Sequence, residues 1–123
     1  MNIGLLIAAI LCLFTWGVHI FLGGPDVAKP LLESQMEEGA KYTNYYCWHI
    51  VTLVLFVMAV GYGYAAFYEG GLDVAILCTA LSIGFTLWSW VLILWSKRTA
   101  LELPQWTLFL VIAGVASWGI WAG

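Results

Sequence analysis

Long apolar runs alternate with short polar segments along the whole chain. Four of the runs are long enough to cross a bilayer, because a transmembrane helix needs about 20 apolar residues and tolerates roughly 17 to 25. They cover residues 3–22, 43–67, 72–96 and 105–122. The pattern therefore predicts an all-α fold: an integral membrane bundle of four transmembrane helices, forming one domain over residues 1–123.

The longest polar segment follows the first run and reads GGPDVAKPLLESQMEEGAKYTNYY. Pro30 suits the first turn of a helix, and Gly39 suits the position after a helix end. Between them, leucines and acidic residues fall on opposite helix faces. We expect a short amphipathic helix from about Pro30 to Glu38 that lies on the cytoplasmic membrane surface. A plain polar connector fits the same residues equally well.

Composition and charge place the chain in a membrane and orient it there. The sequence is 63% hydrophobic and 9% charged, with a mean hydropathy of +0.96, whereas soluble domains are about 25% charged. All four basic residues fall in the first and third loops: Lys29, Lys41, Lys97 and Arg98. The positive-inside rule then puts both termini on the non-cytoplasmic side. We expect the membrane to be a bacterial inner membrane. Acidic residues are mixed with the basic ones, so the charge pattern does not indicate nucleic acid as a partner.

Two histidines at matching depth raise the question of a bound cofactor. His19 lies near the end of the first run and His49 near the start of the second. As a pair they could supply both axial nitrogens of haem b, ligate the magnesium of a chlorophyll-type pigment, or form half of a copper or zinc shell. Both lie about one turn inside the membrane boundary, however, where an imidazole reaches water or a carbonyl at little cost. We favour two ordinary interfacial histidines and keep the ligand pair as the alternative.

Small and aromatic residues mark surfaces suited to contacts between helices. Gly61 with Ala65, and Ala113 with Ser117, have the four-residue spacing that lets helices approach closely. Trp88 and Trp106 belong to an aromatic belt at the cytoplasmic interface. These residues predict packing within the chain or against a partner.

Catalytic motifs are missing from the sequence. It has no H-E-x-x-H, no G-x-S-x-G and no phosphate-binding glycine loop, and we assign no catalytic residues. In size and helix number the chain is similar to the small multidrug resistance transporters, which work as antiparallel dimers with a membrane-buried glutamate in the first helix. Here the first run has no acidic residue, and the uneven distribution of basic residues predicts one fixed orientation. The resemblance therefore ends at size.

Three functions follow as expectations. The first is a non-enzymatic accessory or assembly subunit of a larger membrane complex, whose partners are membrane lipid and either other membrane protein subunits or further copies of the chain. The second is a redox or pigment-binding protein with His19 and His49 as axial ligands. The third is a small homo-oligomeric transporter, although the spans offer only mild polar groups such as Thr79 and Ser82.

Overall fold

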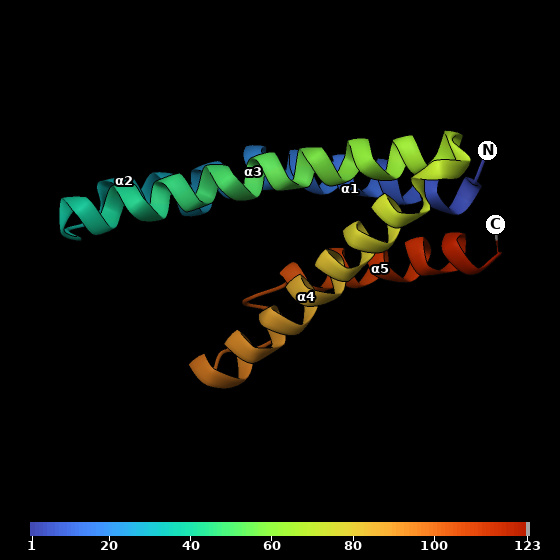
Figure 1. Cartoon of the computed structure of the whole chain (residues 1–123). Coiled ribbons are helices and arrows are strands. Elements are labelled where there is room, and N and C mark those ends of the chain that lie inside the picture. The colour runs from blue at the N-terminus through green and yellow to red at the C-terminus, as the bar shows by residue number, and fades with distance from the viewer. Residues whose placement is uncertain (123) are drawn as a thin grey trace.

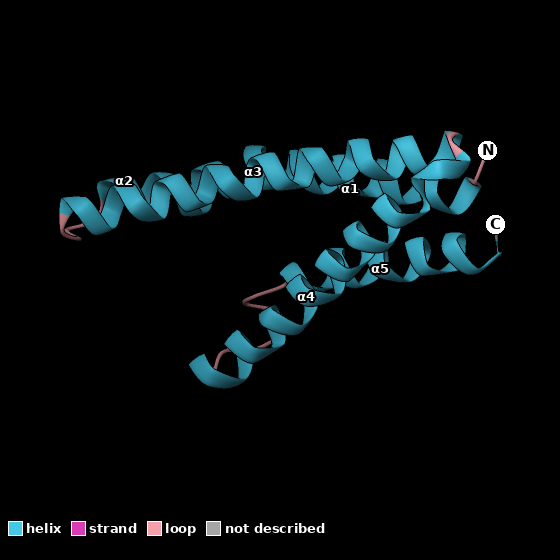
Figure 2. Ribbon diagram, in the orientation of Figure 1, coloured by secondary structure: helices cyan, strands magenta, loops and turns pink. Residues whose placement is uncertain are grey.

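The chain folds entirely into helices and turns. The computed structural model describes residues 1–122, which contain no β-strand (Figure 2). Four stretches are long and apolar enough to cross a membrane, as predicted. The long helices are α1 (Ile3–Phe21), α3 (Glu38–Phe67), α4 (Leu72–Ser96) and α5 (Gln105–Ala122), with three short elements between them: η1 (Gly24–Ala28), α2 (Lys29–Glu33) and η2 (Glu69–Gly71). The bounds of α4 and α5 coincide with the predicted ranges.

The first helical stretch is longer than predicted. Instead of ending at residue 22, helical structure continues through the π-helical turn η1 into α2, giving one stretch from Ile3 to Glu33. Pro25 and Pro30 each lack the N–H that an α-helix interior needs. The wider turn of η1 changes the hydrogen-bonding register between the prolines, so that the chain passes both of them without leaving helical conformation.

The predicted bounds of the surface helix, Pro30 to Glu38, are therefore wrong. Helix α2 ends at Glu33, a turn occupies residues 34–37, and α3 begins at Glu38 rather than at residue 43. Both carboxylate oxygens of Glu37 accept hydrogen bonds, from the N–H groups of Gly39 (2.9 Å) and Ala40 (3.0 Å). These bonds cap α3 and hold the pKa of Glu37 below its usual value. Gly39 lies inside the first turn of α3, not after a helix end.

The long helices form two pairs that meet at one end of the molecule. Helix α1 packs along α3, α4 packs along α5, and α1 also packs on α5. Both termini lie at the end where the pairs meet, and from there α4 diverges from α3 (Figure 1). The hairpin formed by α1, α2 and α3 extends furthest toward the other end. We call this element the long hairpin.

The two pairs are joined by a direct contact between helix backbones. A Cβ atom on Gly4 of α1 would lie 2.5 Å from the Cα of Gly119 on α5, and one on Gly119 would lie 2.8 Å from the nitrogen of Leu5. Asn2 fastens this crossing: its Nδ2 donates to the carbonyl of Gly119 (2.7 Å) and its backbone N–H donates to the carbonyl of Ala66 on α3 (2.7 Å). Its Oδ1 also accepts from Leu5 N–H (3.0 Å) and so caps α1. One asparagine therefore links α1, α3 and α5.

Replacing Gly119 by alanine should destabilise the fold, because the added methyl group would meet the backbone of α1. We expect a loss of about 1–3 kcal/mol in the free energy of unfolding, the usual cost of overpacking. Gly114→Ala is the matched control: it lies on the same helix with no atom within 4 Å of the added carbon, and its higher helix propensity should stabilise by up to about 1 kcal/mol. Helical circular dichroism during SDS titration of the detergent-solubilised protein measures both. Equal stability of the two variants would contradict the close crossing.

Candidate functional site

The side chain of His19 packs against α3. Its ring stacks on the indole of Trp48, with ring centroids 3.8 Å apart and planes inclined by 19°. Its Nε2 lies 3.1 Å from the hydroxyl of Thr52 and 3.3 Å from the carbonyl oxygen of Trp48. Because a carbonyl oxygen only accepts, this geometry places the proton on Nε2, which then donates to α3.

Gly23 makes room for this arrangement on the other side of the indole. A Cβ atom on Gly23 would lie only 2.6 Å from the ring of Trp48, so a larger residue there would displace the indole. Trp48 is thus held between His19 and Gly23, which are one helical turn apart on the first helical stretch. We call His19, Gly23, Trp48 and Thr52 the His19 cluster.

His49 has a different environment. It is exposed, and its ring makes an edge-on contact with Tyr45 one turn earlier on the same helix (4.6 Å between centroids, 88°). Neighbouring residues on a helix point about 100° apart, so when Trp48 turns toward α1, His49 does not. The structure brings the two histidines to adjacent helices but gives each ring its own partner. Ligation of a haem, a pigment or a metal by the pair stays a prediction.

The His19 cluster lies where the long hairpin loses its third helix. Fourteen residues separate Gly119 from Gln105, the first residue of α5, and the same number leads along α1 from Gly4 to Val18. Since Gly4 and Gly119 are in contact, Val18 is roughly level with the start of α5. From His19 onward, the first helical stretch packs against α3 without α5. The His19 cluster supplies a ring stack and a hydrogen bond where this two-helix segment begins.

The predicted small-residue surfaces are used within the chain. Gly61 faces Val74 and Cys78 of α4. Ala65 lies against Gly71, where an added Cβ atom would be 2.5 Å from the Cα of Ala65. Ala113 is buried and Ser117 is half-buried on α5. The spacing thus marks close contact within the chain; contact with a partner through these residues stays a prediction.

The two predicted interface tryptophans differ in accessibility. Trp106 packs against Trp90 (5.0 Å between centroids), and its Nε1 donates to the carbonyl of Ala100 (3.1 Å), which ties the start of α5 to the preceding loop. Trp88 is 62% exposed on α4. Of the two, Trp88 is the side chain more accessible to a partner or to lipid.

Sequence reasoning missed the polar contacts at the centre of the bundle. The hydroxyl of Tyr62, a fully buried residue, lies 3.2 Å from that of Thr79 and 3.5 Å from that of Ser82. The spacing of Thr79, Ser82 and Thr86 on one face of α4 is a signal for an inward face. Nothing in the hydropathy pattern distinguishes Tyr62 from the interfacial tyrosines.

The potential metal ligands of the chain lie apart from one another. Within residues 1–122, His, Cys, Asp and Glu side chains form no group of three that could hold a metal ion. Cys12 and Cys78 are buried free thiols, and Cys47 is exposed. No protein-family model matches the sequence, and neither does any curated protein or solved structure. Function is therefore inferred from the geometry of the chain itself.

Removing the His19 contact should destabilise the protein, because it removes a side-chain hydrogen bond between the two arms of the long hairpin. We expect His19→Ala, and the nearly isosteric Thr52→Val, to lower the free energy of unfolding by about 1 kcal/mol, the typical size of one hydrogen bond. His49→Ala is the control and should have a much smaller effect. SDS titration of the purified variants measures the three values.

The same histidine variants test ligation. If the two residues are axial ligands, the protein extracted from its own membranes has a Soret band that both His19→Ala and His49→Ala abolish. A stability loss confined to His19→Ala, with no chromophore in the parent protein, would assign His19 to helix packing. Equal instability of both histidine variants would contradict that assignment.

Proposed function

We propose that this chain is an integral protein of the bacterial inner membrane that acts as a non-enzymatic accessory or assembly subunit of a larger membrane complex, docking through the long hairpin. The length of that hairpin is the supporting observation. The stretch Ile3–Glu33 has 31 residues and α3 has 30, roughly 45 Å each at 1.5 Å per residue, against a hydrocarbon core of about 30 Å. Helix α5 has 18 residues, roughly 27 Å.

The part of the hairpin that α5 does not accompany has the character of a water-exposed element. Residues 24–46 carry six of the eleven charged side chains of the chain: Asp26, Lys29, Glu33, Glu37, Glu38 and Lys41. Charges at this density are too costly for the hydrocarbon region. We call residues 24–46 the projecting hairpin and place it in the cytoplasm, on the same side as Lys97 and Arg98.

Apolar side chains on the projecting hairpin favour a protein partner. With no third helix to cover them, Val27 is 51% exposed and Tyr42 is 60% exposed, and Met36 and Tyr46 are also exposed. Apolar side chains left uncovered in water mark interaction sites. Four acidic and two basic residues surround them, so the partner surface that fits is apolar with a basic margin.

Shortening the projecting hairpin should release the protein from its complex without removing it from the membrane. Deleting residues 27–33 together with 38–44 takes about two turns from each arm and nearly preserves the facing of the arms. We expect the parent protein to migrate as a larger assembly on native gels after mild solubilisation, and the shortened variant to migrate alone. Co-migration of the shortened variant with the assembly would contradict docking through this element.

Photo-crosslinking from two positions on α3 tests which end of this helix contacts the partner. Benzoylphenylalanine at position 42 should give one discrete protein adduct, which the shortening deletion cannot form. The same residue at position 64 is the matched control, because Tyr64 is also an exposed tyrosine of α3 but lies within the span. An identical protein adduct at both positions would indicate a partner that runs along the whole helix instead.

Thiol labelling tests the orientation. In a background with Cys47→Ser, which removes the exposed thiol, Ser34→Cys should react with a membrane-impermeant maleimide only after the membrane is permeabilised. Gly70→Cys should react in intact spheroplasts. The reverse pattern would overturn the cytoplasmic placement of the projecting hairpin.

A further inference from the structure

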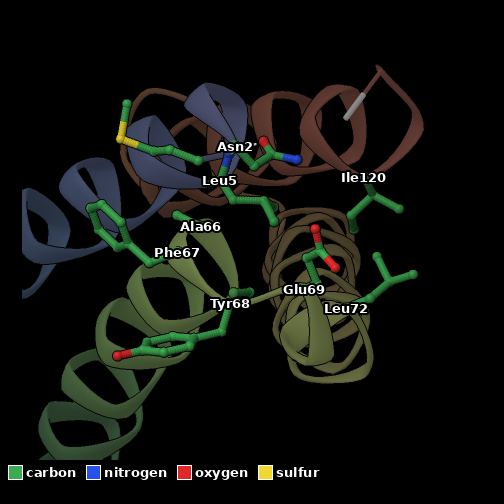
Figure 3. A pocket seen from close by; sticks show the side chains of 10 residues that line it. Asn2, Leu5, Ala66, Phe67, Tyr68, Glu69, Leu72 and Ile120 are labelled. Carbon is green, nitrogen blue, oxygen red and sulfur yellow. Dashed lines mark hydrogen bonds between the residues drawn. The ribbon is translucent and has the colours of Figure 1, made fainter.

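A pocket of about 420 Å³ opens at the end of the bundle that carries the termini. It lies between the start of α1, the end of α3, η2 and the end of α5 (Figure 3). Its size falls in the range of small-molecule sites, which is about 300–1,000 Å³. Its wall is a mixture of polar and apolar groups, and the apolar side chains used below are Leu5, Leu72 and Ile120.

Glu69 is the one charged side chain that lines the pocket. Figure 3 shows its carboxylate between Leu72 and Ile120, directed toward the space beside Leu5. Within residues 1–122 the carboxylate forms no ion pair, the α-amino group of Met1 included, and accepts no hydrogen bond. Helix α4 begins after Gly71 with no side-chain cap, so the carboxylate is not used to cap that helix.

The charge distribution of the chain favours a cation at this pocket. All four basic side chains belong to the opposite end of the helices, in the first and third loops or beside them. Near the pocket the charged side chains are Glu69 and Asp73, both acidic, against one positive charge on the α-amino group of Met1, so these groups together are negative. Asp73 lies in the first turn of α4 and does not line the pocket.

We propose that this pocket binds an amphipathic cation, whose ammonium group pairs with Glu69 while its apolar chain lies against Leu5, Leu72 and Ile120. A free alkylammonium compound and a lipid with an ethanolamine headgroup share this chemistry. The site is at the opposite end from the projecting hairpin, so it goes beyond the proposed function, and neither depends on the other.

An NMR titration of the full chain in the uncharged detergent dodecyl maltoside tests the site. Hexyltrimethylammonium is the probe, and the amide signals of residues 69–72 report binding. We expect a saturable shift that hexanol does not produce at equal concentration. Glu69→Gln should weaken the affinity on the order of fivefold, the upper value of an exposed ion pair. Asp73→Asn, the matched acidic control, should weaken it less than twofold.

A steric variant tests the cavity apart from the charge. Ile120→Trp fills the pocket from α5 and should weaken probe binding by about tenfold or more, and Glu69→Gln provides an independent test if that variant does not fold. Equal weakening by Glu69→Gln and Asp73→Asn would mean attraction by the general field of this end and would overturn the site. An unchanged affinity in both Glu69→Gln and Ile120→Trp would overturn it too.

Adding lipids to the same titration distinguishes a lipid ligand from a free amphipathic cation. An ethanolamine-headgroup lipid added at a few molecules per protein should shift the same amides and compete with the probe if the ligand is a lipid. A glycerol-headgroup lipid, which lacks the ammonium group, should do neither. Competition by the ethanolamine lipid identifies a lipid site, and binding of the probe alone identifies a site for free amphipathic cations. Absence of both responses would overturn the proposal.

Discussion

The backbone contact between Gly4 on α1 and Gly119 on α5 determines how the long helices are arranged. Helices in lipid gain little from burying apolar side chains against each other, because lipid tails are equally apolar, and their association depends on close packing and hydrogen bonds. Both are concentrated at this crossing, where Asn2 adds bonds to the carbonyls of Gly119 and Ala66. Because the two helix pairs are joined at this end, they can diverge toward the other, which leaves the long hairpin to support itself.

That division explains why the His19 cluster lies where it does. Beyond the start of α5, the first helical stretch has α3 as its neighbour and no third helix, so side chains between these two must replace the packing that α5 supplies elsewhere. Stacking on Trp48, the hydrogen bond from Nε2 and the close fit of Gly23 do this within one turn of helix. A histidine near the end of an apolar helix is a candidate ligand, yet here its ring already packs against α3.

Hydropathy predicts the four long apolar helices because it records which segments avoid water. It gives the bounds of α4 and α5 well because polar or turn-forming residues flank each of them. It fails around the first loop. There, Pro30 predicted the first turn of a new helix and Gly39 the position after its end. Helical structure instead continues through the π-helical turn η1 past both prolines, and Glu37 caps the next long helix. For the candidate site, the sequence predicted two histidines on adjacent helices but not the contacts that each of them makes. Trp48 and His49 are adjacent, and their side chains point about 100° apart around the helix. Trp48 is the one that faces the first helical stretch, where it fits against Gly23, and the periodicity of the sequence does not reveal this.

The interior of the bundle and its two ends differ in the chemistry they leave available. On α4 the hydroxyls of Thr79, Ser82 and Thr86 each donate to the carbonyl four residues earlier, and Tyr62 closes on the first two. Hydroxyls bound in this way are already satisfied, and within residues 1–122 no buried side-chain nitrogen or oxygen lacks a partner. A polar path through the centre would need such groups free to bind a substrate or water. The charged groups lie instead at the ends: mixed charges beside apolar side chains on the projecting hairpin, and the unpaired carboxylate of Glu69 in the pocket near the termini. We therefore expect recognition by this protein at the two ends of the bundle, where these charged groups lie.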